Sequence, residues 1–295
     1  MIIHLNGSLV SPDQARISPF DRGFLLGDGV YEGLRSFRRK IVALDRHAAR
    51  MRRALEESRI EWDPDEMEGL SDALLRANEL EDAFVYWQVT RGVPGRGQPV
   101  RTRVPTGPMT PTVLGFCYGQ PVLESYEKPA GISAALVRDT RWTRGHLKSI
   151  SLLGNVIGAY ESRDAEAQDA IFHRDGLLAE GSATNVILAL PGAGGRVTLV
   201  TPSLESVPIL GGITRALLVE QVPGIEERAV KVEEILRARE VMLVGSTAMV
   251  TSVTSLDGHP IGEGVPGPEA SRLLRALVRA IEVEHGTWKR STAVA

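Results

Sequence analysis

The sequence predicts an α/β (α+β) fold of two domains, and three features support this prediction. Short stretches rich in Val, Ile and Tyr alternate apolar and polar side chains, as half-buried strands do. Amphipathic stretches with helical spacing lie between them. A proline-containing segment, GQPVLESYEKPAG, divides the 295-residue chain, which is long enough for two hydrophobic cores. We therefore expect a small N-terminal α/β domain over 1–118, an interdomain linker over 119–131 and a larger C-terminal α/β domain over 132–295.

The N-terminal domain is expected to be mostly β-sheet. In the predicted strand VYEGLRSF, Tyr31, Gly33 and Arg35 share one face, because successive side chains of a strand point to opposite sides. Asp45 is suited to cap the following helix. A Pro-, Gly- and Arg-rich connection over 93–111 has no packing pattern, and loops of this length are usually functional or disordered. Strands are expected over 2–7, 30–37, 41–45, 83–91 and 112–118, and helices over 46–58 and 64–78.

Strands and helices alternate in the C-terminal half. An Asp-Gly turn at 175–176 and the Gly-rich segment PGAGGR mark chain reversals. Strands are expected over 131–137, 169–173, 197–202, 224–230, 241–246 and 250–256, with an extended segment over 177–190 and helices over 152–164, within 210–222 and over 268–284.

The composition argues against several classes of protein. The net charge is −3, so no overall basic field favours nucleic acid. The single cysteine, Cys117, excludes an internal disulfide and a cysteine-based metal site, and the six histidines lack ligand spacing. No apolar run reaches about 18 residues, and no signal peptide opens the sequence. We expect a cytoplasmic protein without a metal and without nucleic-acid or membrane partners.

The stretch RWTRGHLKSISLLGN at 141–155 contains Lys148, around which the expected chemistry is organised. Apolar residues surround Lys148 in the sequence, and desolvation would lower the pKa of its amine and make it nucleophilic. An isolated lysine in this position would more often extend its amine into water from the start of the next helix. The other lysines lie in a turn, a linker, a charged stretch and the polar tail: Lys40, Lys128, Lys231 and Lys289.

Four further fragments carry candidate site residues. LGGITR offers backbone N–H groups and the positive end of a helix, which together favour an anion. AEGSATN contains a carboxylate before small residues, GSTAM ends a strand with two hydroxyls, and one arginine lies on the helix over 46–58. Each fragment alone is also compatible with an ordinary helix cap, turn or solvated charge. The residues are Glu180, Gly212, Ile213, Thr214, Ser246, Thr247 and Arg50.

Together these residues fit one ligand, pyridoxal 5'-phosphate. This cofactor needs a lysine for a Schiff base, a carboxylate that keeps the pyridine nitrogen protonated, and backbone amides for its phosphate. Order and spacing alone do not separate this interpretation from a phosphate-binding enzyme that uses its lysine differently.

The order of the motifs resembles fold-type IV (class IV) pyridoxal-phosphate-dependent aminotransferases. This family includes D-amino acid, branched-chain and some (R)-amine aminotransferases, with aminodeoxychorismate lyase as a relative. The resemblance covers nearly the whole chain, and the order of several motifs is more specific than any one of them. The motifs are FDRGFLLGDGVYEGLRSF, HAARM, YWQVTRG, RWTRGHLKSISLLGN, AEGSATN, LGGITR and GSTAMVTSV.

The resemblance implies roles for individual residues. Lys148 corresponds to the Schiff-base lysine and Glu180 to the acid at the pyridine nitrogen. Cofactor contacts are implied at Arg50, Gly212, Ile213, Thr214 and Ser246, and substrate contacts at Tyr31, Arg35, Arg96 and Thr247.

The motifs mix features of several subgroups. Arg96 matches the loop arginine of D-amino acid enzymes, but those enzymes have a histidine two residues later, where this chain has Gln98. YEGLR is more similar to the branched-chain segment, and Gly33 replaces a threonine of the lyase. The amino donor stays open between a D-amino acid such as D-alanine and a branched-chain amino acid. An (R)-selective amine transaminase, a lyase and a protein that binds the cofactor without turnover are the alternatives.

The resemblance also implies a mechanism and an assembly. The cofactor is expected between the domains, with the C-terminal domain supplying Lys148 and Glu180 and the N-terminal domain closing over the substrate. The freed lysine would move a proton between the substrate Cα and the cofactor C4′, and a 2-oxo acid such as 2-oxoglutarate would accept the amino group. A homodimer is expected, because family members build the site at a dimer interface.

Overall fold

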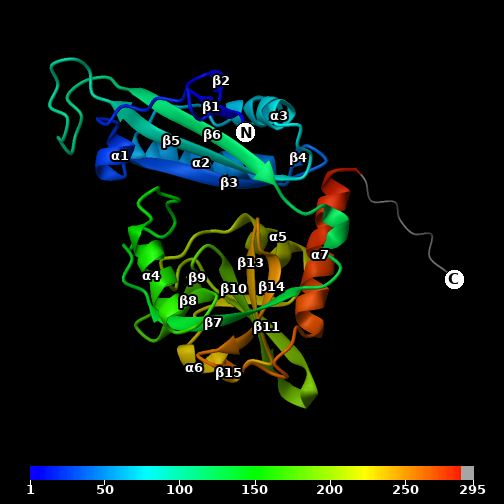
Figure 1. Ribbon diagram of the computed structural model, residues 1–295. Helices are drawn as coiled ribbons and strands as arrows, with labels where there is room; N and C mark the ends of the chain where they lie inside the picture. Colours follow the sequence, from blue (N-terminus) through cyan, green and yellow to red (C-terminus); the bar gives the residue numbers. More distant parts are fainter. Residues whose placement is uncertain (287–295) are drawn as a thin grey trace. The chain divides into compact units, whose positions relative to one another are not determined.

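The computed structural model describes residues 1–286 and divides the chain into two compact units (Figure 1). The first unit comprises Met1–Leu123 together with Leu147–Leu152, and the second comprises Glu124–His146 and Leu153–Ala295. Both units contain a β-sheet and helices, which confirms the mixed α/β fold class. The first unit ends at Leu123, inside the predicted linker. Lys289, predicted in the polar tail, lies outside the described residues.

A six-stranded sheet forms the first unit, with strand order β2-β1-β6-β5-β3-β4 and antiparallel pairing throughout. Helices α2 (Leu44–Ser58) and α3 (Glu66–Ala77) pack on this sheet (Figure 1). Trp87 is fully buried in their common core and donates its indole N–H to Ser71 Oγ at 2.9 Å. The strands are β1 Ile3–Leu5, β2 Ser8–Val10, β3 Gly29–Phe37, β4 Lys40–Ile41, β5 Ala83–Val93 and β6 Thr110–Gly119.

Several local features of the first unit differ from the prediction, including strand β2, which was not predicted. A short helix, α1 (Arg22–Leu26), was not predicted; Asp21 caps it by accepting a hydrogen bond from the Gly23 N–H at 2.8 Å. The strand predicted over 41–45 was too long, because α2 begins at Leu44. Asp45 therefore lies in the first turn of α2 and is not its cap. The N-cap is Ala43, whose positive φ of 49° turns the chain into the helix without a side-chain cap.

A nine-stranded sheet forms the second unit, in the order β12-β11-β10-β13-β14-β7-β8-β9, with β15 paired to β14. Helix α4 (Leu153–Asp164) packs on β7 and β8, and α5 (Ile213–Gln221) and α7 (Pro268–Glu284) pack near β13 and β14 (Figure 1). A four-residue helix, α6, spans Val232–Ile235. The strands are β7 Ala130–Arg138, β8 Asp169–Arg174, β9 Leu177–Gly181, β10 Asn185–Pro191, β11 Val197–Pro202, β12 Ile225–Arg228, β13 Glu240–Gly245, β14 Met249–Leu256 and β15 His259–Pro260.

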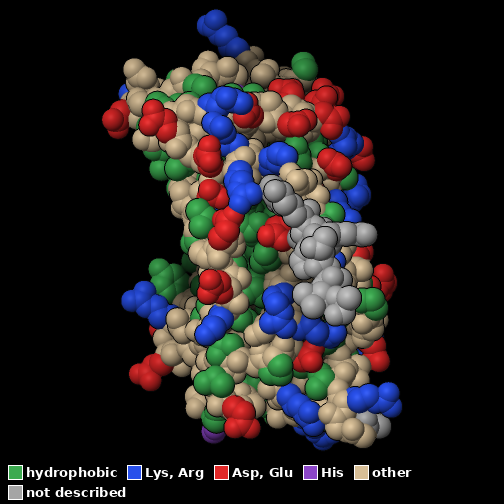
Figure 2. All heavy atoms as spheres, turned by 90° about the vertical axis from the view of Figure 1, so that its right-hand side faces the viewer, with side chains coloured by type: hydrophobic (Ala, Val, Ile, Leu, Met, Phe, Trp, Pro, Cys, Tyr) green, Lys and Arg blue, Asp and Glu red, His purple; other side chains and the backbone are tan. Residues whose placement is uncertain are grey.

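Residues 1–286 show neither a membrane-spanning helix nor a metal-site cluster, and the charges on the face in Figure 2 are mixed. Within residues 1–286, none of the helices has both the length and the apolar character needed to cross a membrane. In the same part of the chain, no three His, Cys, Asp or Glu side chains are grouped as a metal site would require. Basic and acidic side chains are interspersed on the face shown in Figure 2.

Candidate active site

Backbone hydrogen bonds fix Lys148 in the first unit. The Tyr31 N–H donates to the Lys148 carbonyl at 2.9 Å, and the Ile150 N–H donates to the Gly29 carbonyl at 3.2 Å. Val30 and Ser149 form an antiparallel bridge, so the lysine segment lies beside the start of β3. We expected the C-terminal domain to supply Lys148; by its contacts the segment Leu147–Leu152 instead belongs to the first unit. Sequence order could not show this, because the pairing joins segments more than 100 residues apart.

The amine of Lys148 lies against an aromatic side chain. Its Nζ is 4.3 Å from the centroid of the Tyr31 ring, a distance at which a cation is attracted to the ring face. Tyr31 stacks on Tyr86, and Tyr86 stacks on Phe116, with centroids 5.4 and 4.7 Å apart. Burial raises the pKa of Tyr86, whose hydroxyl donates to Gln88 Oε1 at 2.9 Å. The structure therefore brings together two of the predicted residues, Tyr31 and Lys148, on an aromatic surface formed by β3, β5 and β6.

A buried group of charges lies nearby and involves Arg50. Arg50 donates two hydrogen bonds to the fully buried Glu32 carboxylate, from Nε at 2.7 Å and Nη2 at 2.6 Å. His47 Nδ1 lies 2.7 Å from the same carboxylate. Burial lowers the pKa of His47 despite Glu32, and the charges of Arg50 and Lys148 lower it further. Glu32 thus balances the charge of Arg50, and the phosphate contact of Arg50 stays a prediction.

Arg35, predicted to contact the substrate, is buried in the first unit. Its side chain is only 2% exposed, and its guanidinium lies 4.2 Å from the Phe37 ring centroid. Arg35 donates to the carbonyls of Ser36 and Pro121. Through these contacts the guanidinium of Arg35 connects β3 to Pro121, near the end of the Met1–Leu123 segment. These contacts give Arg35 a role in holding β3, and its substrate contact stays a prediction.

Arg96 lies in the connection between β5 and β6 and is exposed. Gln98, at the position where D-amino acid enzymes carry a histidine, is half-buried against Gly107: a Cβ added there would lie 2.3 Å from Gln98 Nε2. Gln98 therefore packs within the connection. The substrate contact of Arg96 stays a prediction.

In the second unit, Glu180 is buried at the end of β9 and held by three groups. Its Oε1 accepts from Arg141 Nη1 at 2.9 Å. Its Oε2 accepts from the Leu210 N–H at 3.0 Å and from Asn185 Nδ2 at 3.3 Å. Arg141 is itself fixed by Asp139, through Nε at 3.0 Å and Nη2 at 3.1 Å. Asn185 also donates to the Leu210 carbonyl at 2.9 Å, so one network fixes the Glu180 carboxylate and the segment just before α5.

The start of α5 lies next to Glu180. Gly212 is the N-cap of this helix, and no side chain caps it. A Cβ on Gly212 would lie 1.9 Å from Asn185 Oδ1, so close packing requires glycine here. Ile213 and Thr214 are buried in the first turn, where helix N–H groups have no intrahelical acceptors. The structure thus brings Gly212, Ile213 and Thr214 together with Glu180, as the resemblance implies.

Ser246 and Thr247 lie in the turn between β13 and β14. Ser246 is half-buried and Thr247 is exposed. The turn is adjacent to the one that follows Glu180, since a Cβ on Gly245 would lie 3.3 Å from the Thr184 side chain. The predicted residues of the second unit are therefore close to one another within that unit.

The turn that follows Glu180 contains a hydroxyl group that is suited to contact a polar ligand. Thr184 Oγ1 is buried and has no hydrogen-bond partner among the described residues, which is unusual for a buried hydroxyl. The uncapped helix start, the Ser246 hydroxyl and the fixed Glu180 carboxylate are groups that a phosphate and a protonated ring nitrogen require. The residues of the second unit therefore fit pyridoxal 5'-phosphate.

Sequence reasoning missed Glu32, His47 and Arg141, which contact the predicted residues Arg50 and Glu180 directly or through Glu32. Glu32 alternates with Val30 and Leu34 on the core face of β3, and a carboxylate on such a face signals a buried partner. His47 and Arg50 are three residues apart on α2, so their side chains share one face of the helix. Arg141 lies within the motif around Lys148 and was not assigned a role, and its contact with Glu180 becomes visible only in the fold.

Comparisons with known proteins agree with these observations. The sequence model of the amino-transferase class IV family matches residues 29–256. A D-alanine aminotransferase of Bacillus licheniformis is 35% identical over 287 residues, which cover 95% of this chain and 97% of that protein. The structure of the Escherichia coli branched-chain amino acid aminotransferase matches with a TM-score of 0.84 at 22% identity, covering 99% of this chain and 97% of that chain. The branched-chain aminotransferase of the archaeon Thermoproteus uzoniensis, solved with norvaline, matches with a TM-score of 0.82 at 23% identity, covering 97% of each chain.

These features are those of a pyridoxal-phosphate-dependent aminotransferase of fold type IV. The chain belongs to the class IV aminotransferase family, as the family match and the 35%-identical relative show. Its substrates are an amino acid donor and a 2-oxo acid acceptor.

Proposed function

We propose that the protein is a D-amino acid aminotransferase that transfers the amino group of D-alanine or a similar D-amino acid to 2-oxoglutarate. The observation that carries this proposal is the 35% identity to a D-alanine aminotransferase over 95% of the chain. The branched-chain enzymes match at 22% and 23% identity and support the fold alone. The proposal therefore favours D-alanine over the branched-chain donor, which the sequence left open.

The chemistry of the proposal rests on a few residues of this chain. Bound pyridoxal 5'-phosphate supplies an electron sink for the bond at the substrate Cα. Lys148, whose amine lies beside the Tyr31 ring, would hold the cofactor, and the freed amine would take the proton from the substrate Cα and deliver it to C4′ of the cofactor. Glu180, kept in place by Arg141, holds a proton at the pyridine nitrogen. The start of α5 and Ser246 bind the phosphate, and Thr247 contacts the substrate.

Arg96 is proposed to bind a carboxylate of the substrate. It is exposed on the arginine-rich connection, and a guanidinium can hold a carboxylate by two parallel hydrogen bonds. The same connection carries Arg101 and Arg103, which are also exposed.

A half-reaction tests the proposed donor. Purified protein loaded with pyridoxal 5'-phosphate is mixed with D-alanine, L-leucine, L-valine or (R)-1-phenylethylamine, and the conversion of the cofactor to its aminated form is followed by absorbance. We expect D-alanine to react fastest and 2-oxoglutarate to reverse the change. Faster conversion by L-leucine would replace the D-amino acid proposal by the branched-chain one. No conversion by any of these donors, together with release of pyruvate from aminodeoxychorismate, would indicate a lyase. Binding of the cofactor with neither reaction would indicate a non-catalytic protein.

The assignment of Lys148 has its own test. Borohydride reduction followed by peptide mapping should place the covalent cofactor adduct on Lys148, and Lys148→Ala should remove both the adduct and the activity. Lys40→Ala is a matched control, because Lys40 is an exposed lysine at the start of β4. An adduct on another lysine would refute the assignment.

We further propose that the protein is a homodimer. The support is an exposed apolar stripe on α4, which includes Leu153 at 71% and Tyr160 at 60% exposure, with Val156 and Ile157 between them. Large apolar side chains at positions i, i+3, i+4 and i+7 form one helix face that favours a protein partner. Light scattering should give the mass of a dimer, and Val156→Glu should shift it toward the monomer, whereas Val283→Glu, the same change at an exposed valine of α7, should not. A monomeric wild-type protein would contradict the proposal.

A cytoplasmic location and the absence of nucleic-acid and membrane partners stay predictions of the composition. Cell fractionation and binding assays would test them.

A further inference from the structure

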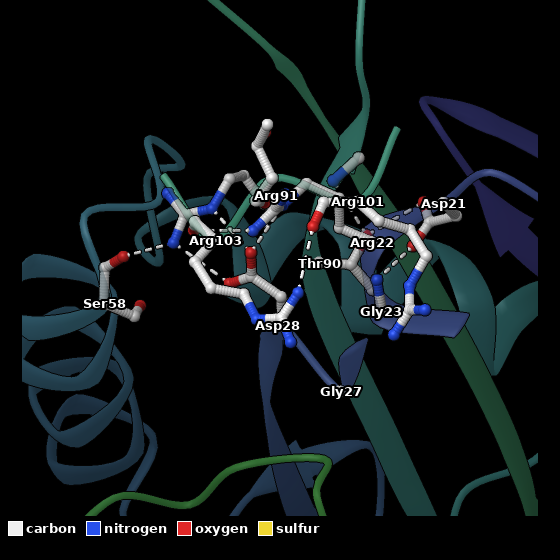
Figure 3. Close-up of polar contacts among 12 residues, drawn as sticks. Asp21, Arg22, Gly23, Gly27, Asp28, Ser58, Thr90, Arg91, Arg101 and Arg103 are labelled. Carbon is white, nitrogen blue, oxygen red and sulfur yellow. Dashed lines mark hydrogen bonds and ion pairs between the residues drawn. The ribbon is translucent and has the colours of Figure 1, made fainter. Parts of the chain in front are cut away.

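The connection between β5 and β6, residues 94–109, is anchored at one point by a buried arginine. Arg22 of α1 is 2% exposed, and its Nη1 donates to the Thr102 carbonyl at 2.5 Å while its Nη2 donates to the Arg103 carbonyl at 3.1 Å (Figure 3). The connection contains no helix or strand of its own. The two bonds from Arg22 therefore hold main-chain carbonyls that no regular secondary structure holds. Both acceptors are main-chain atoms, which leaves the side chains of Arg101 and Arg103 exposed.

Asp28 holds the guanidinium of Arg22 in place. Arg22 Nε donates to Asp28 Oδ2 at 2.7 Å, and Arg91 donates to the same carboxylate from Nε at 2.8 Å and Nη2 at 3.0 Å (Figure 3). Burial opposes ionisation of Asp28, but its bonds to Arg91 and Arg22 hold the pKa of this carboxyl below its usual value. Arg91 also donates to the carbonyls of Ser58 and Arg59, each at 2.5 Å, at the end of α2. One carboxylate therefore ties α1 and β5 to the end of α2.

The two ends of the connection are tied to α1 as well. Asp21 Oδ2 accepts from Thr90 Oγ1 at 3.0 Å (Figure 3) and from Thr112 Oγ1 at 2.6 Å, so it joins β5 to β6 where the connection leaves and returns. Gly92 has a φ of +85°, and a Cβ there would lie 1.8 Å from the Thr110 carbonyl oxygen. Helix α1 thus contacts both the base of the connection, through Asp21, and its middle, through Arg22.

We propose that Arg22 is a positioning residue for substrate binding, because it fixes the main chain that carries Arg96, Arg101 and Arg103. The inference rests on the proposed carboxylate contact of this connection. Arg22 touches no substrate in this scheme. It sets where the exposed guanidinium groups lie, so it influences the KM for carboxylate-bearing substrates and leaves the chemical step unchanged.

The contacts of Arg22 require the forked shape of a guanidinium group. One side chain reaches a carboxylate and two carbonyls at once, because its donors point in fixed and different directions. A lysine has a single ammonium group and keeps only the charge opposite Asp28. Arg22→Lys therefore removes the anchoring of the connection but keeps a positive charge opposite Asp28. Arg22→Gln removes both the anchoring and the charge.

Two measurements on the cofactor-loaded protein test the proposal. Trypsin cleaves after arginine, so limited proteolysis with mass mapping reports how tightly the native protein holds Arg101 and Arg103. Steady-state kinetics with D-alanine and 2-oxoglutarate report KM and kcat. The matched control is Arg16→Gln, since Arg16 also donates to two backbone carbonyls but is exposed. Circular dichroism confirms that each variant is folded, and Arg22→Lys serves where Arg22→Gln does not fold.

We expect cleavage at Arg101 and Arg103 to become about tenfold faster in Arg22→Lys, with KM raised about tenfold and kcat changed less than about twofold, as for the loss of a charge-assisted hydrogen bond. Arg16→Gln should match the wild type in both. Unchanged cleavage would overturn the anchoring, and faster cleavage with unchanged KM would overturn the link to substrate. A wild-type protein that converts no amino acid would contradict the proposed function instead, and the proteolysis would still decide whether Arg22 anchors the connection.

Discussion

Replacing Glu32 by glutamine should destabilise the first unit, and the loss should depend on pH. The Glu32 carboxylate is completely buried and is bonded by Arg50 and His47. Burial would raise the pKa of Glu32, but these two partners hold it at about 2. Glu32→Gln keeps the size of the side chain and removes its charge, which leaves the guanidinium of Arg50 buried without its counter-charge.

Two separate arguments give the size of the loss. The pKa of about 2, against an ordinary value of 4.5, corresponds to about 3 kcal/mol of stabilisation at neutral pH. Breaking a buried ion pair by removing one partner costs about 3–5 kcal/mol, and the lower end applies because glutamine still accepts a hydrogen bond. Both arguments predict a loss of about 3 kcal/mol at pH 7.

The pH dependence follows from the direction of the pKa change. Between pH 4.5 and pH 2 the unfolded chain binds a proton at Glu32 that the folded protein does not, so stability rises with pH in this window. The contribution of Glu32 is complete above pH 4.5 and is lost as the pH falls towards 2. The difference between wild type and variant should therefore narrow below about pH 4.5. His47, whose pKa burial lowers, and the nearby charges of Arg50 and Lys148 are the other titratable or charged groups involved.

Urea denaturation at pH 7, 4 and 3 measures this difference. Replacing Trp142 and Trp288 by phenylalanine leaves Trp87, in the core of the first unit, and Trp62, which packs against that core, as fluorescence reporters. Glu68→Gln is the control, because Glu68 is an exposed acid on α3 of the same unit. A loss at pH 7 as small as that of the control, or a loss that stays constant down to pH 3, would refute the reasoning.

Three further predictions concern the proposed site. Glu180→Gln should keep the cofactor bound and slow single-turnover transamination by about a hundredfold, because the ring nitrogen loses its charged partner; an unchanged rate would remove Glu180 from the chemistry. Arg96→Ala should raise KM for carboxylate-bearing substrates by about tenfold to a hundredfold, for a lost pair worth about 1.5–3 kcal/mol, and should affect an amine without a carboxylate much less. Gly212→Ala should cost about 1–3 kcal/mol and weaken cofactor binding, because its Cβ would collide with Asn185 Oδ1, as thermal unfolding with and without cofactor would show. Gly211→Ala, whose Cβ meets only a leucine methyl at 3.5 Å, should change neither, and equal effects of the two would contradict the packing argument.

Local sequence patterns were enough to predict the fold class and much of the second unit. Alternating apolar residues and turn signals act over a few neighbours, so most strands and a helix within 210–222 could be predicted from the residues around them. Glu180, Gly212, Ile213 and Thr214 were predicted together and lie together in that unit. The motifs that carry these residues are short, and short patterns can be recognised without knowledge of the fold.

The positions of the charged and reactive side chains depend instead on tertiary contacts. Lys148 belongs to the first unit because its backbone pairs with β3, and Arg35 is buried because it binds backbone carbonyls and Phe37. Arg22 and Arg141 acquire their roles from acceptors far along the chain. The physical reason is the cost of burying a charge, which is tolerated only where the folded chain supplies a partner. Because such partners are distant in sequence, spacing and composition could not identify them.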